Sequence, residues 1–343
     1  MSYISTDNIT SINAELTNYC NAACPMCARY YIDGELVVDK VNNMHTSLTF
    51  IKEKIGEGVV KGLKNFTSCG NFGDGAMNPE CLEIYTWVHE MNPNAILTLH
   101  SNGGARNSRF WSDLAKLKVN VIFAIDGLQD TNHLYRRNVK WNKLMQNVNA
   151  FIGAGGNARW EMLVFKHNQH QVEECKKLSN QLGFKAINFK DSSRWADFDS
   201  KGVWREHDKI KVGDYYIEKS NVTESKIITD TDIIGIHGGN SKKEKTNKDD
   251  LKKIQCFAHQ PEKNFVEIYL AVNGDVSPCC WLGDLKMHES KNIIKDYKKV
   301  NLNHSSLKEI LDGDYFQQLE KGIRGDIGAY RLQTCYFTCG LQD

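Results

Sequence analysis

The stretch LTNYCNAACPMCARYY, residues 16–31, places three cysteines within eight positions at the spacing CxxxCxxC. Cys20, Cys24 and Cys27, called the cysteine loop below, directly follow residues 11–17, whose alternation of apolar and polar residues predicts a β-strand. Three thiolates on one loop can hold three irons of a 4Fe-4S cube and leave the fourth iron open to bind another molecule. Structural zinc usually takes four ligands, and no further Cys or His stands near enough in this stretch to complete such a set. The spacing therefore predicts a cluster with an open iron, with zinc as the alternative.

Length and composition set the frame for this loop. A chain of 343 residues is long enough for two domains. Its 43 basic and 42 acidic residues give a net charge of +1, which argues against nucleic acid and against an anionic membrane surface as partners. The polar start MSYISTDNIT is unlike a signal peptide, and no apolar run approaches the length of a membrane span, so a cytoplasmic location is expected. Eleven cysteines in a reducing compartment indicate metal or redox chemistry rather than disulfides.

Strand and helix patterns alternate over the first half of the chain. After the strand at 11–17, we expect strands at 65–69, 95–101, 119–126, 159–165 and 185–190, separated by helices near 80–90, 108–117, 141–154 and 168–182. Successive βα units imply a parallel sheet that is covered by helices. The sequence thus predicts an α/β fold, as a partial or complete βα barrel.

The pattern changes after Lys190. Residues 191–204 show no clear periodicity, and the charged stretch GGNSKKEKTNKDDLKK at 238–253 is typical of a solvated linker. A second unit is expected from about Cys256, where apolar and polar residues alternate around Asn273-Gly274, a hairpin signal. The predicted organisation is a barrel at 1–190, a connecting segment and charged linker at 191–255, and a C-terminal unit at 256–343.

Residues 20–27, and their place after the first strand, resemble the signature of the radical S-adenosylmethionine (SAM) enzymes. The resemblance covers about residues 12–190 and implies a partial (βα)6 barrel in which the open iron chelates SAM. Three further segments resemble the SAM-contact motifs of that family, GNFGDG at 70–75, HSNG at 100–103 and AIDGLQDTNHLYRR at 124–137. By resemblance they assign cofactor binding to Gly73, Asp74, Ser101, Asn102, Asp126 and Arg136. The chain departs from the family pattern at Gly75, where proline is usual.

The remaining cysteines include a second set of possible ligands. Cys256, then Gly274 with Cys279 five residues later, then Cys335 and Cys339, resemble the Twitch module, a shortened relative of the SPASM domain. By resemblance, these four cysteines ligate one auxiliary 4Fe-4S cluster within a small α+β domain. A zinc site with four cysteine ligands is the alternative. Cys280 could replace Cys279, and the sequence leaves that choice open.

Four cysteines lie outside these two ligand sets. Cys81 and Cys175 fall within predicted helices and are expected to be buried as small apolar residues. Cys69 ends the second strand, and Cys280 adjoins an expected ligand. Both are candidate catalytic hydrogen donors, although a buried, inert thiol is an equal possibility for Cys69.

The resemblance implies an oxidoreductase that reductively cleaves SAM to a 5'-deoxyadenosyl radical and removes hydrogen from a substrate carbon. Oxidation or crosslinking of a peptide or a small polar molecule is expected, with an epimerase that uses a cysteine hydrogen donor as the alternative. Because the first strand starts near residue 11, an added leader-peptide-binding domain before it is not expected, and this lowers the expectation of a peptide substrate without excluding it. Two 4Fe-4S clusters, SAM and a flavodoxin- or ferredoxin-type electron donor are implied as cofactors and partner. A non-enzymatic zinc or iron-sulfur binding module is the competing class.

Overall fold

The structure is a computed structural model. It describes residues 4–37, 42–192, 194–201, 203–221, 254, 256–283, 289–324, 332, 334, 335 and 339. The charged stretch at 238–253, which the sequence predicts to be a linker, lies outside the described residues.

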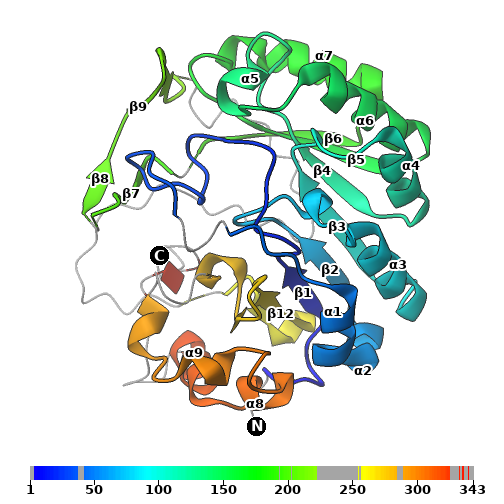
Figure 1. Cartoon of the computed structure of the whole chain (residues 1–343), viewed down its shortest axis with the longest axis vertical. Helices are drawn as coiled ribbons and strands as arrows, with labels where there is room; N and C mark the ends of the chain where they lie inside the picture. The colour runs from blue at the N-terminus through cyan, green and yellow to red at the C-terminus, as the bar shows by residue number, and fades with distance from the viewer. Residues whose placement is uncertain are drawn as a thin grey trace.

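Six parallel strands form the centre of the fold, in the order in which they occur along the chain. They are β1 (Ser11–Ala14), β2 (Asn65–Ser68), β3 (Ile96–Ser101), β4 (Asn120–Ala124), β5 (Asn157–Leu163) and β6 (Ala186–Lys190). The connections between them carry α1 (Leu48–Lys54), α2 (Gly56–Gly62), α3 (Cys81–Met91), α4 (Ser108–Lys116), α5 (Asn132–Tyr135), α6 (Trp141–Gly153) and α7 (Val172–Leu182). The helices α3, α4, α6 and α7 lie along the outer side of the curved sheet (Figure 1). The predicted partial (βα)6 barrel is confirmed.

The two faces of the sheet differ in chemistry. On the helix side, the Phe123 ring of β4 lies 5.3 Å from the Trp111 ring of α4 and 5.8 Å from the Phe151 ring of α6. Because side chains alternate along a strand, Ile122 and Ala124 point to the opposite face, which is called the inner face below. The apolar core therefore lies between the sheet and the helices, and the inner face of the sheet does not pack against these helices.

The sheet continues past β1 into the C-terminal part of the chain. Strand β12 (Phe265–Leu270) pairs in parallel with β1, with Asn13 opposite Tyr269, and antiparallel with both β11 (His259–Gln260) and β13 (Val276–Ser277). The turn before β13 contains Gly274 at φ +89°, so the predicted hairpin around Asn273-Gly274 is confirmed. The sequence predicted a separate unit from about Cys256. That division of the chain remains a prediction, and β12 belongs to the same nine-stranded sheet as the barrel strands.

Residues 191–218 are more regular than their sequence suggested. Strand β7 (Ala196–Phe198) pairs antiparallel with β8 (Trp204–Glu206), and β9 (Lys209–Val212) with β10 (Tyr215–Glu218). Residues 191–204 show no clear periodicity in the sequence, yet β7 lies within them. The turn Gly213-Asp214, with Gly213 at φ +59°, is a two-residue hairpin signal that could have revealed the second pair.

The last described elements lie beside β12 (Figure 1). They include α8 (Leu307–Leu311) and α9 (Asp314–Arg324). A capping box between Ser306 and Glu309 starts α8. Short 3-10 turns are η2 (Gly75–Met77), η3 (Gln169–Gln171), η5 (Pro261–Lys263), η6 (Cys280–Leu282), η7 (Glu289–Asn292) and η8 (Tyr297–Val300). Within the part of the chain that the structure describes, no helix has the length and apolar character to cross a membrane.

Candidate active site

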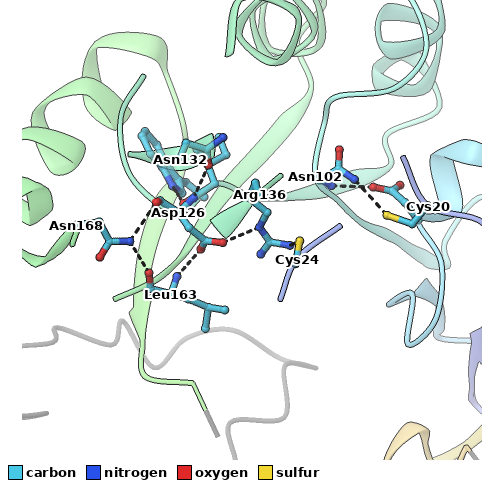
Figure 2. Close-up of polar contacts among 11 residues, drawn as sticks. Cys20, Cys24, Asn102, Asp126, Asn132, Arg136, Leu163 and Asn168 are labelled. Carbon is cyan, nitrogen blue, oxygen red and sulfur yellow. Dashed lines mark hydrogen bonds and ion pairs between the residues drawn. The ribbon is translucent and has the colours of Figure 1, made fainter. Parts of the chain in front are cut away.

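The cysteine loop lies beyond the end of β1, and polar groups from other segments approach its sulfurs. The backbone N–H of Ala22 donates to Cys20 Sγ at 3.4 Å, and Asn102 Nδ2 donates to the same sulfur at 3.6 Å. Arg136 Nη1 lies 3.7 Å from Cys24 Sγ (Figure 2). Such N–H donors stabilise thiolate sulfur in iron-sulfur sites. The donor set therefore fits a thiolate-ligated cluster.

Burial controls the protonation of these thiols. It raises the pKa of Cys20 well above its ordinary value, and Asp74 and the neighbouring thiols raise it further. It also raises the pKa of Cys24 to about 11, although Arg136 opposes the shift. Both groups are thus neutral thiols at pH 7 until iron displaces their protons.

A buried ion pair closes the side of the site next to Cys24. Asp126 follows β4 and is fully buried, and Arg136 Nε donates to its Oδ2 at 2.6 Å. Its Oδ1 accepts the backbone N–H of Leu163 at 2.6 Å (Figure 2). Asn132 and Asn168 bond to the Asp126 backbone on either side. Burial raises the pKa of Asp126, and Arg136 is the main opposing influence. The pair fixes the guanidinium beside the cysteine loop.

The glycine-rich stretch after β2 runs against the cysteine loop. The backbone N–H of Asp74 donates to Tyr19 O at 3.0 Å. A Cβ on Gly73 would lie 1.9 Å from Thr17 O, and a Cβ on Gly75 would lie 2.7 Å from Ser68 Oγ. Glycine is therefore needed at both positions because neighbouring atoms come too close for a side chain.

The Asp74 carboxylate joins this stretch to the end of β3. Its Oδ2 accepts from Ser101 Oγ at 2.9 Å and from the backbone N–H of Asn102 at 2.8 Å, and its Oδ1 accepts from the N–H of Ala76 at 3.0 Å. Asn102 in turn donates to Asn21 Oδ1 at 2.9 Å. Asp74, Ser101 and Asn102 thus form one hydrogen-bonded unit with the cysteine loop. Their assignment as SAM-binding residues remains a prediction.

Sequence reasoning missed two residues that fasten the same loops. Arg29, buried and two positions after Cys27, donates through Nη1 to the carbonyls of Asn18 and Phe72. Glu15, buried after β1, accepts the N–H of Phe72. A charged residue at the end of a predicted buried strand was the available signal for Glu15. No comparable signal marks Arg29.

The four cysteines of the second set influence one another electrostatically in the described C-terminal part, although no three of them are arranged as ligands of one metal ion. The thiol of Cys256 hydrogen-bonds with that of Cys339, which with burial raises the pKa of Cys256, and Cys279 and Cys335 act on it electrostatically. Burial also raises the pKa of Cys279, with Cys335 as the next contribution. The structure therefore groups Cys279, rather than Cys280, with the other three.

Cys280 faces the other way, toward Cys69. A hydrogen bond between these two thiols is the main cause of the raised pKa of Cys280. Asn71 connects both, because its Oδ1 lies 3.6 Å from Cys69 Sγ and its Nδ2 donates to Cys280 O at 2.8 Å. Along β2, Phe66 packs on Tyr85 of α3, so the alternation places Thr67 and Cys69 on the inner face. The two candidate hydrogen donors thus form one pair, called the thiol pair below.

The burial predicted for the two helical cysteines is confirmed. Cys81 in α3 and Cys175 in α7 are fully buried, as predicted. Among the described residues, no three His, Cys, Asp or Glu side chains converge as ligands around a single metal ion.

Residues 262–340 match the model of the SPASM family, an iron-sulfur cluster-binding domain. No curated protein sequence matches the chain. SuiB of Streptococcus suis bound to S-adenosylmethionine aligns with a TM-score of 0.58 at 14% identity, over 92% of this chain and 68% of SuiB.

Two peptide complexes align equally well. SuiB bound to its precursor peptide SuiA gives a TM-score of 0.59 at 14% identity, over 96% of this chain and 70% of SuiB. The enzyme anSMEcpe with bound AdoMet and the Cp18Cys peptide gives 0.55 at 12% identity, over 97% of this chain and 88% of that one.

At these identities the likeness concerns the fold, and the family match concerns the C-terminal residues. Together they confirm the resemblance to radical SAM enzymes with a SPASM-like domain at the level of architecture. The chain therefore shares the partial-barrel fold of these SAM-binding proteins, and its residues 262–340 match the SPASM iron-sulfur cluster-binding domain.

Proposed function

We propose that this protein is a radical SAM enzyme that removes a hydrogen atom from a substrate carbon and oxidises or crosslinks its substrate. The proposal rests above all on the three thiols of the cysteine loop, two of which are contacted by N–H donors: Cys20 by Ala22 and Asn102, and Cys24 by Arg136. When bound, the first cluster would supply the electron for reductive cleavage of SAM to methionine and a 5'-deoxyadenosyl radical, and the auxiliary cluster would accept the electron that the substrate loses.

The residues of the chain divide the remaining work. Cys20, Cys24 and Cys27 would hold the first cluster, and Cys256, Cys279, Cys335 and Cys339 the auxiliary one. Arg136, fixed by Asp126 at 2.6 Å, offers a cation to the SAM carboxylate. The unit of Asp74, Ser101 and Asn102 holds the glycine-rich stretch and the end of β3 in place for the rest of SAM.

A peptide substrate has support from the comparisons. SuiB and anSMEcpe, with which this chain shares its fold over most of its length, were each solved with a peptide bound. A small polar molecule remains the other candidate, and an acidic electron-transfer protein of the flavodoxin or ferredoxin type is the proposed reductant.

Cleavage of SAM tests this function. Reconstituted, reduced protein should convert SAM to 5'-deoxyadenosine, and Cys24→Ala should abolish the product. Cys175→Ala, which truncates a buried cysteine of α7 far from the cysteine loop in sequence, is the matched control and should retain product formation. Persistent cleavage by the Cys24→Ala variant, or zinc in place of iron after anaerobic reconstitution, would refute the proposal.

The thiol pair favours a second candidate, a redox-neutral epimerase. A substrate carbon radical would take the hydrogen atom of the Cys69 or Cys280 S–H, which forms a C–H bond and leaves a thiyl radical. One electron from the flavodoxin-type donor and one proton from solvent would then restore the thiol.

Isotope content separates the two candidates. In deuterated water with a reacting substrate, oxidation gives a product two hydrogens lighter without deuterium at carbon. Epimerisation gives an isomer with one deuterium at carbon, and Cys69→Ala or Cys280→Ala should then remove both deuterium uptake and product.

A further inference from the structure

The inner face of the sheet carries a set of polar side chains that the proposed function does not use. His100 of β3, Ile122 of β4 and Arg159 of β5 share one level of the parallel register. One step further, Glu161 lies opposite Asn188 of β6. Trp160, between Arg159 and Glu161, packs on Phe184 on the helix side, so its two neighbours point inward.

Glu161 forms an ion pair with Lys190 of β6, so the charges of these two side chains neutralise one another. Lys190 Nζ lies 2.7 Å from Glu161 Oε1, with side-chain exposures of 31% and 16%. Burial lowers the pKa of His100, and that ring is therefore neutral at pH 7. Among the side chains named at these levels of β3 to β6, the remaining charge is that of Arg159.

Arg159 and Asn188 each present a buried atom that lacks a partner among the described residues. The guanidinium Nη1 of Arg159 has no hydrogen bond, and neither has Oδ1 of Asn188, a residue that is 6% exposed. Leaving a buried donor or acceptor unpaired is unfavourable, most of all on a charged group. An anion with an adjacent N–H or O–H donor would satisfy both atoms.

We propose that Arg159 and Asn188 bind an anionic group of the substrate, a carboxylate or a phosphate, at the inner face. The inference rests on the proposed function and adds the class of substrate. Leu163 of β5 bonds to Asp126 at the level of the candidate SAM site. Arg159 stands four residues earlier, about 13 Å along the strand at 3.3 Å per residue.

That separation fits a substrate that is anchored at one end and reacts near the other. The SAM carboxylate cannot be the anion, because the proposed function holds it at the open iron. A peptide with an acidic side chain and a phosphorylated small molecule both have the required chemistry.

Calorimetric titration of the reconstituted, SAM-loaded protein with inorganic phosphate and, separately, with acetate at constant ionic strength tests the proposal. Arg159→Gln should weaken binding at least about tenfold, as the loss of a charge-assisted hydrogen bond implies. Arg159→Lys should restore part of it. Arg109→Gln, which removes a guanidinium of the same charge that is 90% exposed on α4, should bind like the wild type.

Glu161→Gln should change anion affinity in the direction opposite to Arg159→Gln. A merely structural role of these residues would not produce opposite changes. Removal of this carboxylate releases Lys190 from its ion pair, so anion binding should tighten several-fold. Tighter binding of phosphate supports a phosphorylated substrate, and tighter binding of acetate supports a carboxylate.

Equal binding by wild type, Arg159→Gln and Glu161→Gln would overturn the proposal. The titration needs no SAM cleavage, so failure of this site and failure of the proposed function are separate results. If the protein binds the anion through Arg159 yet forms no 5'-deoxyadenosine, the anion site is supported and the proposed function is refuted.

Discussion

At the scale of single residues, neighbours decide which of two adjacent cysteines belongs to which site. Cys279 interacts with Cys335 and Cys339, whereas Cys280 interacts first with Cys69. In the sequence, both cysteines directly follow the predicted hairpin. Adjacent residues of an extended chain point to opposite sides. The sequence alone does not show which of the two sides faces the other cysteines.

We therefore expect the two alanine variants to differ in iron content. Cys279→Ala should lose about four irons per chain after reconstitution, the content of one 4Fe-4S cluster, and Cys280→Ala should lose none. Iron analysis of the purified variants checks this. Loss of iron from Cys280→Ala alone would reverse the assignment.

A buried histidine in the C-terminal part predicts a dependence of stability on pH. Burial lowers the pKa of His259 to about 4 from its ordinary 6.5. The unfolded chain therefore binds a proton that the folded protein excludes, and the stabilisation present above pH 6.5 is lost as the pH falls toward 4. Between pH 7.5 and pH 5 the linkage relation gives a loss of about 2 kcal/mol.

Denaturant unfolding of wild type and His259→Gln at these two pH values measures that loss. The variant should show a fall in the free energy of unfolding that is smaller by about 2 kcal/mol. An identical fall in both proteins would show that His259 is not the group responsible.

At the scale of elements, the sequence predicted the repeating parts well. All six barrel strands have the expected order. Their positions could be predicted because buried parallel strands are continuous apolar or alternating runs. The contact of β12 with β1 could not be predicted, since 256 residues separate Leu270 from its partner Ala14 and no local pattern specifies a strand partner. Likewise, Asp126 and Arg136 lie in one sequence motif, so both could be identified from the sequence. The hydrogen bonds of Arg29 depend on the position of the glycine-rich stretch relative to the cysteine loop, which no local pattern shows.

The glycine-rich stretch gives a prediction at this scale. Gly73→Ala would place a Cβ 1.9 Å from Thr17 O, so the stretch must move away from the cysteine loop. We expect a loss of about 2 kcal/mol or more in the free energy of unfolding, and weaker SAM binding. Gly58→Ala in α2, where a Cβ meets nothing within 4 Å, is the control and should stabilise the protein slightly.

Calorimetry of SAM binding and denaturant unfolding, applied to both glycine variants, give the comparison. If Gly73→Ala bound SAM and unfolded like the Gly58→Ala protein, the close approach of the two loops would be wrong.

At the scale of the whole molecule, one sheet connects the two predicted cluster sites. Tyr269 of β12 donates through its hydroxyl to Glu15 Oε2 at 2.8 Å, and Glu15 accepts the N–H of Phe72 beside Gly73. Glu267, also on β12, accepts from Ser11 Oγ of β1 at 3.1 Å. The C-terminal part is thereby tied to the strand that precedes the cysteine loop.

Tyr269→Phe should reveal the strength of this connection. The change removes one donor from a buried carboxyl and should lower the free energy of unfolding by about 1–3 kcal/mol. Tyr216→Phe, at an exposed position of β10, should leave it within about 0.5 kcal/mol. Equal stability of the two variants in denaturant unfolding would contradict a contribution of this bond.

The central claim is that the cysteine loop holds a cluster whose fourth iron binds SAM. Electron paramagnetic resonance of the reduced Cys279→Ala variant, with and without SAM, tests it most directly, because the auxiliary cluster is expected to be absent. We predict the signal of one reduced 4Fe-4S cluster whose spectrum changes when SAM is added. A spectrum that SAM leaves unchanged, or the absence of any cluster signal, would contradict the claim.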